Sequence, residues 1–264
     1  FKKNTSIIRL NMLEMIFYGK TGTGHIGSSL SITEIIFYLF SNVIYKGNKK
    51  KHHFILSKGH AVPILYSMYY SMGLISLKDI KNFRTFNSRL QGHPDKTKLN
   101  ILDSGSGALG QGLSTTIGYA IGNMINNNKM NAYCLIGDGE MQEGQIWESA
   151  LYAGSKKVNN ICVIVDANKF QNEFLVEKTL KLTNVEKKWE SFGWEFINID
   201  GHSFKDLKKS INKMEKKRSK PLVIYANTTK GKGISYMEND NFWHGGIMKK
   251  ENYEIAISEL KNNL

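Results

Sequence analysis

The amino-acid sequence predicts an α/β fold, with a single three-layer domain over residues 1–264 in which helices cover both faces of a mainly parallel sheet. Short β-branched runs end at turn residues and alternate with segments of helical periodicity, which is typical of parallel strands joined by crossover helices. The chain has 264 residues and 41% of them are hydrophobic, which is enough for a sizeable core. We find no internal repeat and no low-complexity linker that would divide the chain.

The five expected strands are short and almost uninterrupted in their apolar character. Strands that are covered on both faces lack the polar alternation of half-exposed strands, so this pattern favours a sheet buried between two layers of helices. In chain order the expected strands are His53 to Leu56, Ala132 to Ile136, Ile161 to Val165, Glu195 to Ile199 and Leu222 to Tyr225.

Helical periodicity identifies six expected helices between and around these strands. The first, SITEIIFYLFSNV, covers residues 31–43 and starts with Ser31 and Glu34 at the spacing of a capping box. The others cover 61–72, 110–125, 143–155, 184–193 and 203–217. In the last of these Ser203 is the expected N-cap, and a lysine-rich face is expected to be exposed to solvent.

Composition limits the classes of function. The net charge is +13, but only four of the 36 basic residues are arginine, and this lysine bias does not by itself predict nucleic acid as a partner. Cys134 and Cys162 lie in apolar runs, so we expect buried free thiols and a cytoplasmic protein. No apolar stretch approaches the roughly 20 residues of a membrane span, so no membrane association is predicted.

The segment starting at Gly137 carries the clearest chemical signal. Asp138 stands between two glycines directly after one expected strand, and Asn168 follows the next expected strand. The 28 residues between Gly139 and Asn168 have the length of one strand-helix-strand crossover, so the two strand ends can be neighbours. Carboxylate and amide oxygens at one edge of a parallel sheet suit Mg²⁺ or Ca²⁺, and the glycines would let a diphosphate approach the backbone.

This spacing resembles the thiamine diphosphate signature, and further segments resemble the N-terminal part of transketolases. The matching segments, between about residues 20 and 246, are TGTGHIGSSLS, FILSKGHAVPILY, QGHPD, SGSGALGQGLS, GDGEMQEGQIWE, IDGHS and KGKGISYMEN with FWHGG. Their order along the chain is also the order in that family. The resemblance implies a transketolase-type transferase that uses thiamine diphosphate and a divalent cation.

The resemblance implies a role for individual residues around the cofactor. Asp138, Asn168 and the backbone carbonyl of Phe170 would bind Mg²⁺ or Ca²⁺. The thiamine diphosphate itself would contact His60, Gly107, Leu109, Gly139, Asn168 and His244. Residues Gly110 to Gly112 open an expected helix, whose first amide groups could hold anionic groups.

The catalytic residues implied by the resemblance are His25, His93, His244 and Glu143. The histidines would face the sugar and the reacting centre, where an imidazole can donate or accept a proton near neutral pH. Glu143 would lie near the subunit interface and help to order an acidic network at the partner's cofactor-activating glutamate. His202 precedes the N-cap Ser203, and a role in ordering its loop is as well supported as a contact with a ligand.

Three features depart from the family pattern. The segment KFQNEFLVEK follows Asn168 in place of an acidic residue and Gly, Ala108 replaces the Ser or Pro of the glycine loop, and Ile26 follows His25 in place of Pro. The last feature is similar to transketolases that are divided into two chains.

The resemblance therefore implies a two-chain transketolase that transfers a ketol unit from a ketose phosphate to an aldose acceptor. This chain would be the diphosphate-binding subunit, and a separate C-terminal subunit that binds the pyrimidine would complete an α2β2 heterotetramer. Three alternatives remain open at this point. They are a related ketol transferase or synthase that makes an unusual sugar, a basic binding protein that keeps only the fold, and a fragment of a longer enzyme.

Overall fold

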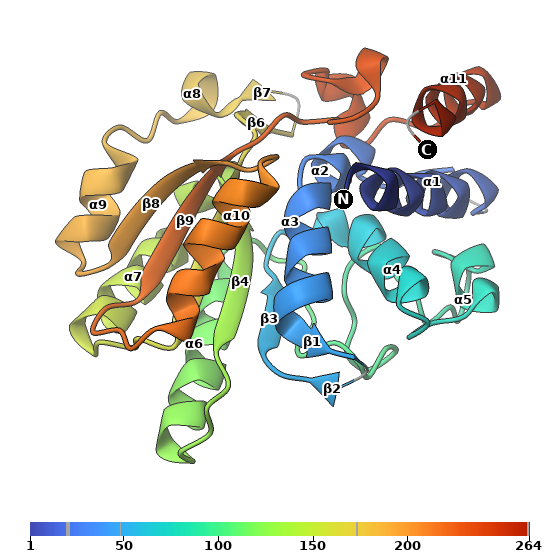
Figure 1. The fold of residues 1–264 in the computed structure, drawn as a ribbon. Helices are drawn as coiled ribbons and strands as arrows, with labels where there is room; N and C mark the ends of the chain where they lie inside the picture. Colours follow the sequence, from blue (N-terminus) through green and yellow to red (C-terminus); the bar gives the residue numbers. More distant parts are fainter. Residues whose placement is uncertain (20–21, 48, 173, 263) are drawn as a thin grey trace.

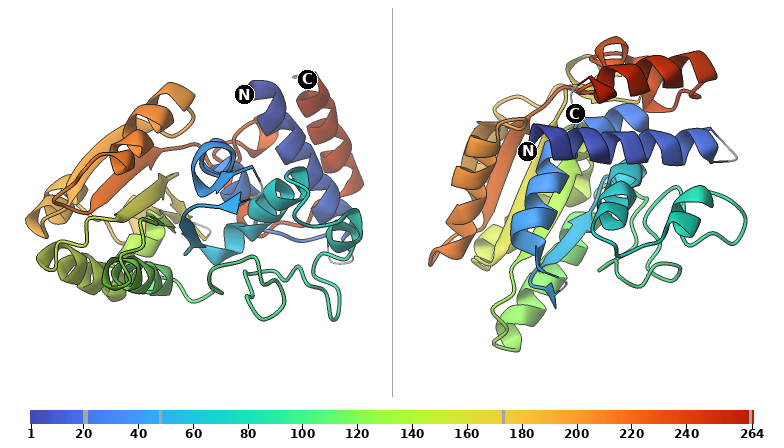
Figure 2. Two further views of the ribbon diagram at one scale, coloured as in Figure 1. Left: turned by 60° about the horizontal axis from the view of Figure 1, so that its bottom comes forward. Right: turned by 45° about the vertical axis from the view of Figure 1, so that its right-hand side comes forward.

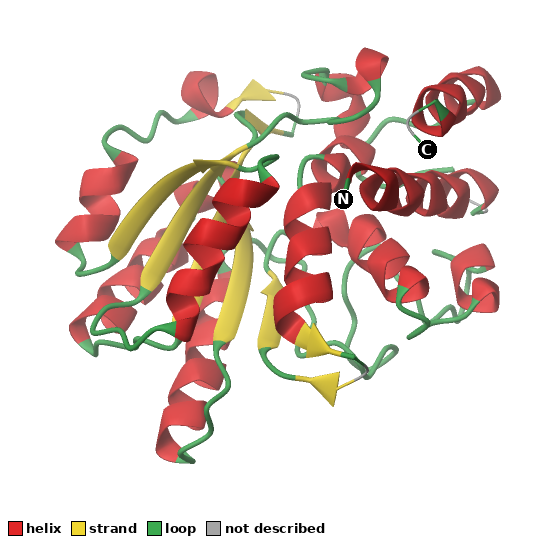
Figure 3. Cartoon of the chain, viewed as in Figure 1, coloured by secondary structure: helices red, strands yellow, loops and turns green. Residues whose placement is uncertain are grey.

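A five-stranded parallel sheet lies at the centre of the computed structural model (Figures 1 and 3). All five expected strands are present, in the spatial order β3-β4-β5-β9-β8, and every neighbouring pair is parallel. The strands are β3 (His53–Leu56), β4 (Ala132–Gly137), β5 (Ile161–Ala167), β8 (Glu195–Asp200) and β9 (Leu222–Asn227).

The structure describes residues 1–19, 22–47, 49–172, 174–262 and 264. Thr21 of the TGTGHIG segment and Glu173 of the loop after Asn168 therefore lie outside the described residues. Within that loop, β6 (Phe170–Gln171) and β7 (Phe174–Leu175) pair as an antiparallel hairpin. A second hairpin joins β1 (Tyr45–Lys46) to β2 (Lys49–Lys50).

The α-helices surround the sheet and extend beyond its β3 edge (Figures 1 and 2). In chain order they are α1 (Lys2–Tyr18), α2 (Ile26–Leu30), α3 (Thr33–Leu39), α4 (Val62–Ser71), α5 (Leu77–Lys81), α6 (Gln111–Ile125), α7 (Gly144–Ser155), α8 (Val176–Thr179), α9 (Val185–Ser191), α10 (Phe204–Ile211) and α11 (Lys250–Lys261). A π-helical turn (Phe40–Ile44) extends α3. The 3-10 turns are Gly59–Ala61, Gly139–Gln142, Asn212–Glu215, Ser235–Met237 and Asn241–His244.

Alternate residues of each strand supply two hydrophobic cores. On one face Tyr133 and Leu135 of β4 join the core that contains side chains of α1, α3, α4 and α10. On the other face Cys134 and Ile136 join the core formed with α6, α7 and α9. Both faces of β4 and β5 are buried, which explains why their sequences are continuous apolar runs. The two cysteines are fully buried free thiols, as predicted.

The predicted capping box at residues 31–34 is wrong. The N-cap of α3 is Ile32, which has no side-chain cap. Ser31 Oγ instead donates to the carbonyl of Ser28 at 3.0 Å and to Asp166 Oδ2 at 2.7 Å. The Glu34 carboxylate pairs with Arg9 at 2.6 Å. Tertiary partners have thus taken both polar groups of the expected box.

The other expected helices are present with shifted ends. The helix expected over 203–217 is α-helical only to Ile211 and continues as the 3-10 turn at 212–215, while Ser203 is its N-cap and accepts from the Asp206 amide. The pattern analysis did not identify α1, α5 or α11. None of the described helices is long and apolar enough to cross a membrane.

Gly154 and Gly118 provide a matched test of how tightly the helices pack. A Cβ atom at Gly154 in α7 would collide with the carbonyl oxygen of Phe192, whereas a Cβ at Gly118 in α6 would meet nothing within 4 Å. We expect Gly154→Ala to lower the free energy of unfolding by about 1–3 kcal/mol because the backbone must shift. Gly118→Ala should raise it by about 0.5–1 kcal/mol. Urea denaturation measures both, and equal effects of the two substitutions would contradict the packing described.

Candidate active site

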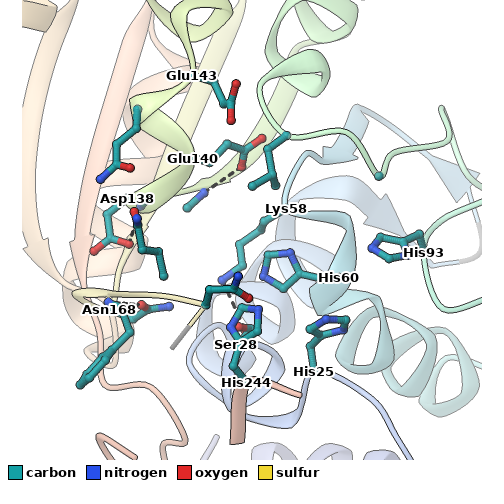
Figure 4. A pocket seen from close by; sticks show the side chains of 18 residues that line it. His25, Ser28, Lys58, His60, His93, Asp138, Glu140, Glu143, Asn168 and His244 are labelled. Atoms are coloured by element: carbon teal, nitrogen blue, oxygen red, sulfur yellow. Dashed lines mark hydrogen bonds between the residues drawn. The ribbon is translucent and has the colours of Figure 1, made fainter. Parts of the chain in front are cut away.

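A cavity of about 380 Å³ opens where the carboxyl ends of β3, β4 and β5 meet the loops that follow them (Figure 4). In open parallel sheets this edge is the usual position of a ligand site. The cavity collects every residue that the sequence assigned to the site. These are His25, His60, His93, Gly107, Leu109, Asp138, Gly139, Glu143, Asn168, Phe170 and His244. Their roles stay predictions, but the structure brings the residues together.

Four histidines from four separate segments form one wall of the cavity. His25 is the N-cap residue of α2, His60 lies in the 3-10 turn after β3, His93 lies in the loop before α6, and His244 ends the turn at 241–244. The ring of His25 is central, with centroids 5.0 Å from His60, 6.0 Å from His93 and 5.2 Å from His244. We call these four residues the histidine wall.

The histidine wall is neutral at physiological pH. Burial, followed by the nearby His93 and Arg84, lowers the pKa of His25 from 6.5 to about 4. Burial, and then the Lys230 ammonium, lowers the pKa of His244 to about 3. Burial likewise holds the pKa of His60 well below 6.5. Neutral imidazoles can both accept and donate a proton, which is the property that acid-base chemistry on sugar oxygens needs.

Asp138 lies in the 3-10 turn region at the end of β4 and is 5% exposed. Its Oδ1 accepts from the Gly139 amide at 2.8 Å and its Oδ2 accepts from the Lys169 amide at 2.6 Å. The described residues supply no ion pair to this carboxylate. Burial, followed by the charge of Asp166, raises its pKa to about 7. A buried carboxylate without a countercharge is where a cation would be stabilising.

The residues around Asp138 fit a cation bound to diphosphate. Asn168 Oδ1 faces the same turn and accepts from the Phe170 amide at 3.0 Å. The Gln171 Oε1 atom is buried beside them and has no hydrogen-bond partner among the described residues. A Cβ on Gly139 would stand 2.7 Å from Gln171 Cβ, so only glycine leaves this backbone open. These are hard oxygen donors of the kind that Mg²⁺ and Ca²⁺ prefer.

The described residues contain no group of three or more His, Cys, Asp or Glu side chains that could hold a metal ion. Only Asp138 among the expected ligands belongs to those types. The other expected donors are an amide oxygen and a backbone carbonyl, so such a cluster is not what this site would show.

Asp166 is a functional-site residue that the sequence analysis missed. It is completely buried at the end of β5, where it pairs with the buried Lys58 ammonium. Its carboxylate also accepts from Thr228 Oγ1, and from Asn168 Nδ2 at 2.7 Å. Because Asn168 donates its amide nitrogen to Asp166, its oxygen is left for the cavity side. The signal was present as a lysine between Ser57 and Gly59, directly after an apolar strand.

Glu140 is a second missed residue, and it occupies the start of α6. Its Oε1 accepts from the Gly110 amide at 2.8 Å and from Ser57 Oγ at 2.5 Å, and its Oε2 accepts from the Gly137 amide at 3.0 Å. The Gly112 amide donates to Ser57 Oγ at 3.1 Å. The helix amides that were expected to hold an anionic group therefore bind the chain's own carboxylate and a hydroxyl.

Glu143, Gly107 and Leu109 lie on the more open side of the cavity. Glu143 is exposed at the N-cap of α7, beside Gly110. Leu109 is 37% exposed although it lines the cavity. His202 lies outside the cavity, where its ring orders two loops through Glu34 and the Thr229 amide. The loop-ordering role considered for His202 is the one that the structure shows.

Comparison with known proteins connects this cavity to a family. The family model described as "Transketolase, thiamine diphosphate binding domain" matches residues 2–263. One of the two named subunits of the apulose-4-phosphate transketolase of Phocaeicola vulgatus is 31% identical over 261 residues, which are 97% of this chain and 92% of that protein. The 6-deoxy-6-sulfo-D-fructose transketolase subunit SqwG of a Clostridium species is 33% identical, over 97% of this chain and 94% of that protein.

Longer relatives match this chain over part of their length. Human transketolase is 35% identical over 249 residues, which cover 92% of this chain and 39% of the human protein. The crystal structure of transketolase from Campylobacter jejuni superposes with a TM-score of 0.88 at 29% identity, over 98% of this chain and 42% of that one. The chain thus spans about two fifths of the length of these longer proteins.

The lowered pKa values of the histidine wall predict how stability changes with pH. In the unfolded chain an imidazole binds a proton near pH 6.5, whereas folded His25 and His244 do so only near pH 4 and pH 3. Below pH 6.5 the unfolded state therefore binds more protons, and stability falls as the pH falls. We expect a His25→Asn, His244→Asn double variant to lose less stability than the wild-type chain between pH 7 and pH 5. Urea denaturation at both pH values measures this, and equal losses would show that the two rings are not held neutral.

Proposed function

Because this chain belongs to the family of transketolase thiamine diphosphate-binding domains, we propose that it is the diphosphate-binding subunit of a two-chain transketolase. The complete enzyme would transfer a two-carbon ketol unit from a ketose phosphate to an aldose acceptor. The observation that carries this proposal is the convergence of all the expected site residues on one cavity at the carboxyl edge of the sheet. Two relatives of similar length are named as transketolase subunits, which supports the division into two chains.

In this proposal Asp138 and Asn168, with the carbonyl oxygen of Phe170, hold Mg²⁺ or Ca²⁺, and the cation holds the diphosphate. The buried Asp138 carboxylate would gain the countercharge that it otherwise lacks. Gly139 lets the diphosphate approach the backbone, since a side chain there would collide with Gln171. Gly107 and Leu109 border the cofactor on the open side of the cavity.

The histidine wall moves protons on the substrate side of the same cavity. His25 and His93 would hydrogen-bond the carbonyl and hydroxyl groups of the sugar, while His60 and His244 lie near the diphosphate and the reacting centre. Thiamine diphosphate supplies the nucleophilic carbon and the electron sink for carbon-carbon bond cleavage. Because the imidazoles are neutral, they can take a proton from a sugar hydroxyl and return it later.

A partner subunit completes the site. We propose that the partner binds the aminopyrimidine and supplies the activating glutamate, in an α2β2 heterotetramer to which Glu143 contributes near the interface. The exposed position of Glu143 at the cavity rim supports this assignment. We also propose a cytoplasmic enzyme, which the two buried free thiols support.

A second candidate function is a ketol transferase that acts on an unusual sugar. The names of two relatives favour it, since one belongs to a transketolase for apulose-4-phosphate and the other to a transketolase for 6-deoxy-6-sulfo-D-fructose. Both candidates use the same cavity and differ only in the donor. Initial rates with xylulose 5-phosphate and with the two unusual sugars would separate them.

Asp138→Ala tests the proposed cation site. Removal of the only expected ligand with a full negative charge should lower the affinity for thiamine diphosphate at saturating Mg²⁺ by about 100-fold or more, while the fold is kept. Isothermal titration calorimetry on the complex with the partner subunit measures the change. Glu148→Ala, which removes an exposed carboxylate from α7, is the control. Unchanged affinity in the Asp138 variant would remove this residue from the site.

The partner proposal predicts that the purified chain alone has no ketol transferase activity. Activation of thiamine diphosphate needs a carboxylate at the pyrimidine and a pocket for the bent cofactor, and the proposal assigns both to the partner. Addition of the subunit encoded by the neighbouring gene should restore transfer from xylulose 5-phosphate to an aldose, with a maximum near one to one stoichiometry. Full turnover by the chain alone would refute the two-chain proposal.

A further inference from the structure

A cluster of charged side chains outside the cavity joins three distant parts of the chain. Arg9 comes from α1, Glu34 from α3, and His202 from the loop between β8 and α10. Arg9 is 4% exposed and Glu34 is 8% exposed. Arg9 Nη2 donates to Glu34 Oε1 at 2.6 Å, and His202 Nδ1 lies 2.9 Å from Glu34 Oε2. Both carboxylate oxygens are therefore engaged.

The hydrogen bonds of His202 define its protonation state. The Thr229 amide donates to His202 Nε2 at 2.9 Å, so this nitrogen must be free of a proton. Nδ1 then carries the proton and donates it to Glu34. Burial alone would raise the pKa of Glu34, but the hydrogen bond from His202 and the charge of Arg9 hold that pKa below its ordinary value. Glu34 is thus an ionised anchor between two donors.

This cluster holds the loop at residues 228–233 at two points. His202 accepts from the amide of Thr229, and Arg9 Nε donates to the carbonyl oxygen of Lys232 at 3.0 Å. Gly233 has φ +96°, and a Cβ there would stand 2.8 Å from Arg9 Nε, so the guanidinium reaches the loop only because this residue is glycine. The two contacts bracket Lys230.

Lys230 carries the geometry from this loop to the cavity. Its side chain is buried, and its Nζ donates to Asn241 Oδ1 at 3.0 Å and lies 3.4 Å from His244 Nδ1. Both contacts are in the 3-10 turn that ends with His244, which lines the cavity (Figure 4). A displacement of the loop would move the ammonium away from His244.

We propose that Arg9, Glu34 and His202 act as a clamp on residues 228–233 and are positioning residues for Lys230 and His244. None of the three lines the catalytic cavity, so they act through the loop and not on the substrate. The proposal rests on the function proposed above only where it links the position of His244 to turnover. The geometry of the clamp itself stands on the contacts described.

Two substitutions of His202 separate the two bonds of its ring. Asn can place an amide nitrogen near the Nδ1 position, which keeps a donor for Glu34 but removes the acceptor for Thr229. Gln can place an oxygen near the Nε2 position, which keeps the acceptor for Thr229 but loses the bond to Glu34. Arg9→Lys is a third variant, because lysine keeps the charge opposite Glu34 and loses the donor to Lys232. Glu195→Gln is the control, since it removes a carboxylate that pairs with Lys213 and Arg218 elsewhere.

Two measurements on the full chain report the clamp directly. Hydrogen exchange at Thr229 should accelerate about fivefold or more in His202→Asn, as expected for one lost hydrogen bond of about 1 kcal/mol, and less in His202→Gln. The imidazole of His244, followed by NMR, should titrate at a higher pH once Lys230 moves away and the ring is less buried. In the assembled enzyme kcat should fall about tenfold or more, because catalysis is sensitive to small displacements.

The outcomes distinguish the clamp from the proposed function. Exchange and His244 titration that remain as in the wild type in both His202→Asn and Arg9→Lys would overturn the clamp. If His202→Asn does not fold, Arg9→Lys decides by the same two measurements. Changed exchange and titration without any transferase activity in the wild-type complex would refute the proposed function, and with it the link to turnover, while the clamp would stand. Equal changes in Glu195→Gln would show general destabilisation and would also overturn the proposal.

Discussion

The buried carboxylate of Asp166 is the interaction on which the rest of the cavity depends. It lies at the end of β5 with no exposure to solvent and accepts hydrogen bonds from Ser31, Lys58, Asn168 and Thr228. These donors belong to the segment before α3 and to the ends of β3, β5 and β9. A buried carboxylate that loses a donor is strongly destabilising, so the four segments must keep their relative positions. One charge thereby fixes the edge of the sheet at which the ligand site lies.

The same arrangement explains the electrostatics of the cavity. The Lys58 ammonium is committed to Asp166, and the like charge of Asp166 is one cause, after burial, of the raised pKa of Asp138. The fixed ammonium groups of Lys58 and Lys230 also contribute, after burial, to keeping the nearby imidazoles of His25 and His244 neutral. The cavity therefore combines one carboxylate that a cation would stabilise with a set of uncharged proton acceptors. A cation-bound diphosphate and a sugar need these two environments side by side.

The sequence predicted the sheet and the lining of the cavity well, and it failed for interactions between distant segments. Strands covered on both faces leave a continuous apolar run, so all five were visible. The lining residues lie in short motifs directly after those strands. In contrast, the expected capping box at Ser31 failed because Ser31 bonds Asp166, 135 residues away. Arg9 bonds the carbonyl of Lys232 across 223 residues, and no local pattern announces such a partner.

Polar contacts, more than apolar packing, set the precision of the catalytic edge. The hydrophobic cores hold the strands and helices, but the histidine wall stands on loops beyond the strand ends, where little apolar surface remains to be buried. Loops of this kind keep a fixed shape only if their backbone groups find partners. Glu140 provides them for the glycine loop before α6, and the clamp of Arg9, Glu34 and His202 provides them for residues 228–233. Each of these buried charges sits one layer behind a residue that lines the cavity, so the geometry of the site is determined by groups that a ligand never touches.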